Sequence, residues 1–238
     1  MSVQRRIPDK SKSAPQDNAP IYDYPKSKSI SGSADAQTRV FFSDGISKIQ
    51  ANQLFRSVVV EEISIAASVR EIDDYAFYGC SRLKKVTFAD HSELTRIGKY
   101  AFYGCSALES IRLPQSLRVI DTAAFKACKA LKTVEFMEGS QTERIGASAF
   151  EDCASLTAFT IPPRVHTISN SLFYGCRSLM YFTIPATVEL VENFALYTKG
   201  KFKHIDIHSR NTVFAEFALL NSYEDTMGLN TLTVGKDR

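Results

Sequence analysis

Residues 97–117 read IGKYAFYGCSALESIRLPQSL, and variants of this stretch recur along most of the chain. When the copies are aligned on the central aromatic residue, neighbouring copies lie 23 or 25 residues apart. A fixed period of this length is typical of solenoid proteins, in which each repeat packs against the next. We call the central residue of each copy its anchor, and the anchors are Leu54, Phe77, Phe102, Phe125, Phe150, Phe173 and Leu196.

The residues around each anchor also form columns. An aliphatic residue stands five positions before the anchor, and further apolar residues follow at six, nine and eleven positions after it. The last two alternate with polar residues, which is the period of a half-buried β-strand, so Val86 and Phe88 should point inward while Lys85 and Thr87 point outward. The Ala-Phe-x-x-Cys segment is too short for a full helix and ends in a glycine in several copies, so it predicts one helical or 3₁₀ turn.

These features predict a repeat solenoid that is mainly β, with short helical or 3₁₀ turns and about seven to eight units of 23–25 residues. A single unit cannot bury its own apolar side, whereas stacking places the anchors in one internal column. The extra two residues of the longer units fall at 90–93 and 139–141, where a wider turn absorbs them.

The chain divides into two predicted regions. Residues 1–38 are rich in Ser, Lys, Asp and Pro, and their closely spaced prolines predict a disordered leader. This leader is either a solvated tail or a phosphorylation or docking segment around Tyr22 and Tyr24. Residues 39–238 form the predicted solenoid, with core repeats at about 45–207 and a degenerate C-terminal cap at 208–238.

Composition excludes several function classes. The longest apolar runs are far shorter than the roughly 20 residues of a transmembrane helix, and the first residues lack the apolar stretch of a secretory signal. A net charge of +3 over 238 residues is too weak to predict nucleic-acid binding. The sequence therefore predicts neither a nucleic-acid partner nor a membrane span, and we expect a monomer.

The stretch from Ile97 to Leu117 resembles the BspA-type leucine-rich repeat, summarised as IGxxAFxxCxxLxxIxIPxSV. The resemblance covers about residues 45–207. It implies a curved, two-sided solenoid of the kind found in bacterial surface antigens, and it implies adhesion or other protein binding with no catalytic residues. Because no secretion signal or anchor is visible, we expect a cytoplasmic protein, with the cell surface as the alternative.

The five cysteines share one repeat position, three residues after the anchor, at Cys80, Cys105, Cys128, Cys153 and Cys176. An odd number at equal steps is a poor disulfide framework, so a buried thiol column is expected. Neighbouring repeats lie about 5 Å apart, which leaves a disulfide or a metal site open.

Motifs of catalysis are missing from the sequence, which has no Gly-rich phosphate loop, no G-x-S-x-G and no H-E-x-x-H. We therefore expect no catalytic residue and no cofactor. One polar group is a weak candidate for a metal site: His204, Asp206 and His208 alternate with apolar residues and should share one outer face. The same pattern also arises from ordinary polar residues on an exposed strand.

The outward side chains of the strands are the expected working surface. Most are small, and a few distinctive ones predict where a partner binds, because Tyr and Arg are favoured anchors of interfaces and Met makes adaptable contacts. The tyrosines that recur at 78, 103 and 174 are instead expected to serve packing. We interpret the chain as a non-catalytic protein-binding module, a scaffold or adhesin, with a metal-dependent or carbohydrate-binding solenoid as the alternative. The candidate binding residues are Arg112, Glu135, Met137, Tyr181, His204 and Asp206.

Overall fold

The computed structural model describes residues 39–200, 202–219 and 231–234, all within the compact unit Gly32–Arg238. The predicted leader at 1–38 lies outside the described residues. The longer strands are β1 (Arg39–Phe42), β3 (Glu62–Ile65), β5 (Lys85–Phe88), β7 (Ser110–Leu113), β9 (Thr133–Phe136), β12 (Tyr181–Ile184), β14 (His204–Ile207) and β16 (Thr231–Val234). The two-residue strands are β2 (Lys48–Ile49), β4 (Glu71–Ile72), β6 (Arg96–Ile97), β8 (Val119–Ile120), β10 (Arg144–Ile145), β11 (Thr167–Ile168), β13 (Leu190–Val191) and β15 (Val213–Phe214).

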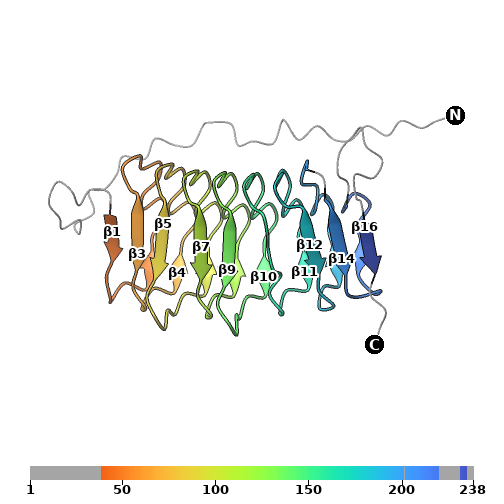
Figure 1. Ribbon diagram of the computed structural model, residues 1–238. Helices are drawn as coiled ribbons and strands as arrows, with labels where there is room; N and C mark the ends of the chain where they lie inside the picture. Colours follow the sequence, from red (N-terminus) through yellow and green to blue (C-terminus); the bar gives the residue numbers. More distant parts are fainter. Residues whose placement is uncertain (1–38, 201, 220–230, 235–238) are drawn as a thin grey trace. The chain divides into compact units, whose positions relative to one another are not determined.

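The strands stack in parallel, one repeat upon the next (Figure 1). The longer strands form the ladders β1-β3-β5, β7-β9 and β12-β14-β16, and the short strands form β2-β4-β6-β8-β10 and β11-β13-β15. Their register aligns equivalent positions, for example Ile63 with Val86 and Ile111 with Val134. This confirms the predicted β-solenoid. Because β15 pairs with β13 and β16 pairs with β14, these two strands extend the stack beyond the region with a clear repeat consensus.

The core is the column of anchors. The rings of Phe77, Phe102, Phe125, Phe150 and Phe173 are fully buried, and neighbouring ring centroids lie between 5.0 and 6.2 Å apart. Each ring is covered by the repeats before and after it. Burial of a phenylalanine contributes roughly 1.5–3 kcal/mol, so the stack, and not the single repeat, is the stable unit.

The structure differs from expectation in the turn that carries the anchor. The described residues contain no helix, and so none that could cross a membrane. Two positions in this turn, two residues before and two after the anchor, are left-handed, as at Tyr75 (φ 59°) and Gly79 (φ 70°). A left-handed residue interrupts a helix. It also turns alternate amides toward the next repeat, where Tyr75 N, Phe77 N and Gly79 N donate to carbonyls 2.7–2.8 Å away.

Glycine is required four residues before the anchor of the longer repeats. Asp73 and Asp121 occupy this position in the preceding repeats, and each accepts a hydrogen bond from the next amide at 2.9 Å. A Cβ placed on Gly98 would lie 2.5 Å from Asp74 Oδ1 and 2.6 Å from Asp74 N, and one on Gly146 would lie 2.6 Å from Thr122 N. The aspartate turns therefore fill the space that a side chain would need.

Outward residues of the short strands form an ion-pair network. Arg96 Nη1 lies 2.6 Å from Glu71, and Arg96 Nη2 lies 2.7 Å from Asp74 and 3.1 Å from Asp121. Lys48 pairs with Asp73 at 2.9 Å, and Arg144 pairs with Asp121 at 3.4 Å. These pairs connect the successive repeats from β2 to β10.

We expect Gly98→Ala to destabilise the protein by about 1–3 kcal/mol, because the added methyl group meets backbone atoms of the preceding turn. The measurement is the midpoint of urea unfolding. Lys99→Ala, which removes an exposed side chain one residue away, is the control and should unfold at the wild-type midpoint. Equal midpoints for both variants would show that the preceding turn yields freely to the methyl group.

Candidate functional site

The outward side chains of the longer strands make up the strand face, on which the sequence placed the candidate residues. The register confirms their rows: Arg112 stands beside Glu135, Tyr181 beside His204, and Thr183 beside Asp206. A residue on a parallel ladder is held by the pairing of its strand, so these side chains project from fixed positions. The strand face fills the front of Figure 1.

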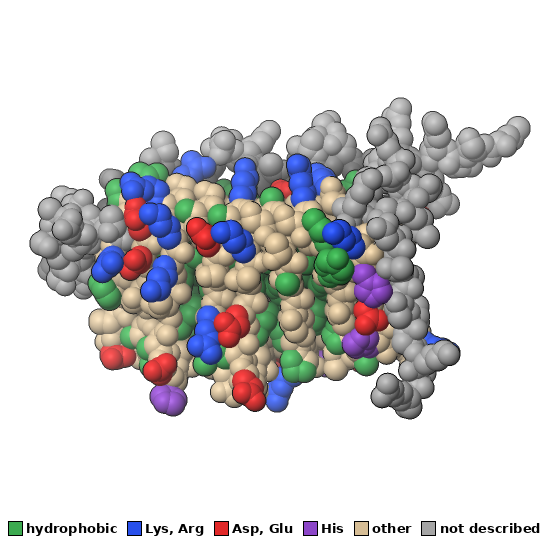
Figure 2. Space-filling model, viewed as in Figure 1, with side chains coloured by type: hydrophobic (Ala, Val, Ile, Leu, Met, Phe, Trp, Pro, Cys, Tyr) green, Lys and Arg blue, Asp and Glu red, His purple; other side chains and the backbone are tan. Residues whose placement is uncertain are grey.

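Ion pairs between repeats cover the N-terminal half of the strand face, and blue and red side chains meet there in Figure 2. The pairs are Arg39–Glu62 (3.1 Å), Lys84–Glu61 (2.9 Å), Arg82–Glu61, Lys132–Glu109 (2.9 Å) and Arg112–Glu135 (3.2 Å). The hydrogen bond from Lys84 lowers the pKa of Glu61, and the one from Lys132 lowers the pKa of Glu109. Exposed pairs of this kind contribute little to stability, because water and salt screen their charges. Their main effect here is to leave this half with mutually compensated charges.

The C-terminal half of the strand face exposes several apolar side chains, whereas the N-terminal half exposes Phe41 on β1 beside its ion pairs. Tyr181 is 59% exposed, Met180 39% and Met137 36%. Small residues, Ala158 and Thr160, occupy the strand face of the repeat that lies between those of Met137 and Tyr181. We call these five residues of the C-terminal half the apolar window. In Figure 2 an apolar cluster lies toward the right of the strand face, beside two histidines with a carboxylate between them.

His204, Asp206 and His208 border the window without forming a metal site. His208 Nε2 lies 3.0 Å from Asp206 Oδ2, so the carboxylate is engaged by its neighbour on the same strand. In the described part of the chain, no group of three His, Cys, Asp or Glu side chains is placed to hold a metal ion. Lys203 Nζ lies 5.9 Å from the centre of the Tyr181 ring and adds a cation at the same border.

Five of the six candidate residues thus fall into two groups, and Met137 stands apart. Arg112 and Glu135 form an ion pair with each other, whereas Tyr181, His204 and Asp206 lie together on β12 and β14. Met137 directly follows β9. The strand-face segment of the next repeat, residues 157–162, lies between it and Tyr181 on β12. The sequence reading overlooked Met180, which directly precedes its strand. Its row is Glu61, Lys84, Glu109, Lys132, Thr157, Met180 and Lys203, so one apolar residue among polar ones was the available signal.

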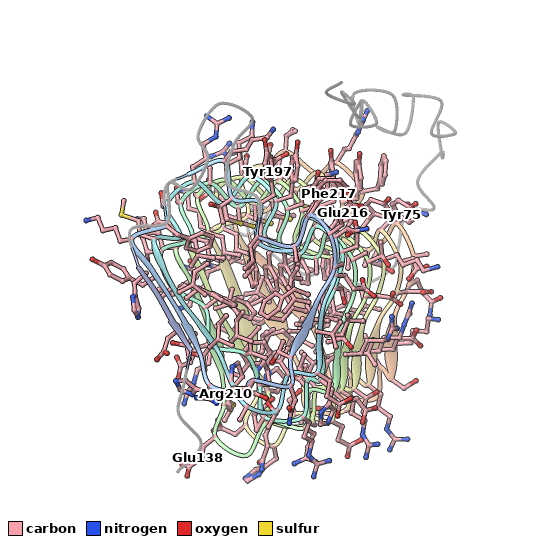
Figure 3. The ribbon with its side chains drawn as sticks, turned by 90° about the vertical axis from the view of Figure 1, so that its right-hand side faces the viewer. Tyr75, Glu138, Tyr197, Arg210, Glu216 and Phe217 are labelled. Carbon is pink, nitrogen blue, oxygen red and sulfur yellow. The ribbon has the colours of Figure 1, made fainter. Side chains whose placement is uncertain are left out.

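The turns that carry the anchors present a second surface, the turn face. Phe55, Tyr78 and Tyr103 stack one above the other with centroids 4.9 and 4.6 Å apart, and Tyr174 stacks on Tyr197 at 5.1 Å. Viewed along the stack, Tyr75, Tyr197 and Phe217 lie on one side, opposite Glu138 and Arg210 (Figure 3). The ring faces are occupied by one another, which leaves mainly ring edges for a partner.

An ion pair interrupts this aromatic column. Lys126 and Glu151 occupy the two positions between Tyr103 and Tyr174, with Nζ and Oε1 3.0 Å apart. Glu151 is almost fully buried. The pair therefore fills a gap in the column.

The cysteines form a column of buried, unpaired thiols. Each thiol donates to the carbonyl of the preceding repeat's anchor, as from Cys80 Sγ to Leu54 O at 3.0 Å and from Cys128 Sγ to Phe102 O at 3.1 Å. Burial raises the pKa of Cys80 and of Cys128 to about 12 and also raises the pKa of the other three thiols. A reactive cysteine has a lowered pKa and is partly exposed, so the column is structural and inert.

A sequence profile of the BspA type leucine rich repeat region matches residues 47–143 and 143–233, in six copies. Among solved structures, a leucine-rich repeat protein of T. pallidum is 32% identical; the match covers 60% of this chain and 67% of that chain, with a TM-score of 0.56. No curated protein matches the chain.

Two more distant structures share the fold. A leucine-rich repeat protein from Bacteroides ovatus ATCC 8483 is 24% identical over 83% of this chain and 63% of that chain, with a TM-score of 0.59. The pneumococcal vaccine antigen PcpA is 17% identical over 83% of this chain and 60% of that chain, with a TM-score of 0.50. In both cases the chain spans less than two thirds of the other protein, and the similarity is one of fold.

The thiol column predicts that stability falls at alkaline pH. Below about pH 8.5 the thiols are neutral in both the folded and the unfolded states, so their contribution is fully present. Above that pH the unfolded chain loses thiol protons that the folded chain keeps, and stability drops by up to about 1.4 kcal/mol per pH unit for each thiol. The measurement is urea unfolding from pH 7 to 10. Cys128→Ala should show a shallower decline than wild type, and an identical slope would contradict the assignment.

Proposed function

Because the chain belongs to the BspA-type leucine-rich repeat family, we propose that it binds a partner protein through the apolar window of its strand face. The observation that carries this proposal is the exposure of Met180 and Tyr181 in two rows of the strand face whose other residues are polar or small. Leucine-rich repeat arrays are binding scaffolds whose extended surface suits a macromolecule. A binding role accounts for the repeat array without a catalytic activity.

The apolar window has the composition of an interface centre. Tyrosine is enriched among the few residues that dominate binding energy, and methionine fills irregular contacts because its side chain is flexible and polarisable. Tyr181 belongs to a paired strand, so little backbone order must be gained on binding. Polar groups at His204, Asp206 and Lys203 supply the rim that such a centre requires.

The N-terminal half of the strand face, which carries the ion pairs and which we call the charged half, is a weaker candidate for the binding site. Its carboxylates and cations already pair across the repeats, as at Arg112 and Glu135. A partner that covered this pair would remove both charges from water. Only the interaction energy in excess of that desolvation cost would contribute to its affinity. We therefore place Arg112 and Glu135 at the edge of the binding site and Met137, Met180 and Tyr181 at its centre.

The alternative of a metal-dependent or carbohydrate-active solenoid gains no support from the described residues. Asp206 is engaged by His208, and the exposed carboxylates of the charged half are held by lysine or arginine. Whether the module acts as a scaffold inside the cell or as an adhesin on its surface depends on the identity of the partner.

We expect Tyr181→Ala to weaken partner binding by about 1–3 kcal/mol without lowering stability, because the ring projects outward and its removal opens no cavity. Full-length wild type serves as the bait and a resin without bait as the blank, and the partner is the protein enriched on wild type over the blank. Its affinity for wild type and for Tyr181→Ala is then measured by calorimetry.

Lys85→Ala is the matched control, because Lys85 is exposed in the same row as Tyr181 but on β5 in the charged half. It should bind the partner as wild type does. If Lys85→Ala weakens binding while Tyr181→Ala does not, the binding site lies on the charged half and the proposal is wrong.

A further inference from the structure

Strand pairing is interrupted on both sides of the solenoid at one repeat boundary, between the turn of Phe150 and the turn of Phe173. Among the described strands, the short-strand ladder ends at β10 and starts again at β11, with no pairing between them. On the strand face, residues 157–162 form no strand, and within the described chain the backbone from 158 to 161 makes no hydrogen bond to β9 or β12. The other interruption, between β5 and β7, affects the strand face alone.

Phe159 provides a physical cause. It occupies the inward position that is Ile or Val in most repeats, and its ring centroid lies 4.9 Å from those of both Phe150 and Phe173. The centroids of Phe150 and Phe173 are 6.2 Å apart, the widest spacing in the anchor column, compared with 5.0 Å for Phe102 and Phe125. A ring set against two neighbouring anchors acts as a wedge between their repeats.

Hydrogen bonds at the turn face still cross this boundary. Ser148 N donates to Asn170 O at 2.9 Å, Phe150 N to Leu172 O at 3.2 Å, and Asp152 N to Tyr174 O at 2.7 Å. On the side of the short strands, the Ser169 hydroxyl donates to Ile145 O at 2.6 Å. Ile120 O, the equivalent of Ile145 O in the preceding repeat, accepts a backbone amide instead.

Ion pairs also stop at this boundary. The pairs of the strand face and of the short strands connect repeats between Arg39 and Glu151, and His166 pairs with Glu189 on the far side. Among the described residues, no ion pair joins the two sides.

We propose that the solenoid bends at this boundary, between Ile145 and Thr167, with the hydrogen-bonded turn face as the hinge axis. Residues on either side form two blocks, and opening at the strand face separates residues 158–161 from β12. Met137 lies in one block, while Met180 and Tyr181 lie in the other. Bending therefore changes the width of the apolar window. The hinge rests on pairing and packing and does not depend on the proposed function.

Hydrogen exchange of the full-length protein tests the local part of this proposal. The amides of residues 158–161 should exchange roughly tenfold faster than those of residues 135, 182 and 184, which face β7 or β14, because residues 158–161 lack strand bonds. The amides of Ser148, Phe150 and Asp152 should remain slow, because they form the axis. Equal protection of residues 158–161 and of the two flanking strands would overturn the proposal.

Pulsed electron–electron distance measurements test the bending itself. Nitroxides on Arg112→Cys with Thr183→Cys span the boundary, and nitroxides on Ser64→Cys with Glu135→Cys span the same number of repeats within one block. All four positions share one outward row, and the native thiols are buried from the label. The spanning pair should give the broader distance distribution. Distributions of equal width would overturn the hinge. The control pair also spans an interruption of the strand ladder, the one between β5 and β7, so a missing strand pairing is present in both measurements.

Phe159→Ile tests the cause. It should narrow the distribution of the spanning pair and slow exchange at residues 158–161 toward the level of the neighbouring strands. Phe182→Ile is the matched control, because Phe182 has the same position in the next repeat but lies in the paired strand β12. A spanning distribution that is unchanged by Phe159→Ile would overturn the assignment of the hinge to this side chain.

Discussion

Everything in this solenoid depends on the way in which the backbone of each anchor is hydrogen-bonded to the next repeat. The amide of Phe77 donates to Ala101 O in the next repeat, and the carbonyl of Phe77 accepts the thiol of Cys105. A buried backbone group without a partner costs about 1–3 kcal/mol, so these bonds allow the anchor to be fully buried. Cysteine suits its position because it is small, apolar and still a donor. The recurring Phe and Cys are thus two parts of one requirement.

The same packing of the anchors in every repeat explains why the strand register could be predicted from the sequence. A strand period of two combined with a fixed repeat length leaves one register, so the inward Val86 and the outward Lys85 followed directly from the sequence. The rows of Arg112 with Glu135 and of Tyr181 with His204 were correct for the same reason. Features that repeat in every unit are visible in one sequence, because each copy confirms the others.

Features that depend on backbone conformation or on one unusual repeat were not visible. The predicted helical turn is in fact a pair of left-handed positions. Ala123 and Ser148 adopt this conformation, although neither residue type indicates it as glycine would. Phe159 satisfied the apolar column, so its effect on strand pairing could not be seen before the rings were placed. Met180 directly precedes its strand, and attention to strand positions alone left it out of the candidate site.

The aspartate and glycine positions have a consequence for how such a chain can lengthen or shorten. Asp73 is followed by Gly98 in the next repeat, and Asp121 by Gly146, because each aspartate turn fills the space above it. The pattern recurs from Phe77 to Phe125 and from Phe102 to Phe150, and both intervals are 48 residues. Loss of the Phe102 repeat alone would bring two aspartate turns into the same space, whereas loss or duplication of two repeats together keeps a glycine beside each aspartate turn. In this part of the chain, the unit that a gene can copy without penalty is therefore the pair of repeats and not the single repeat.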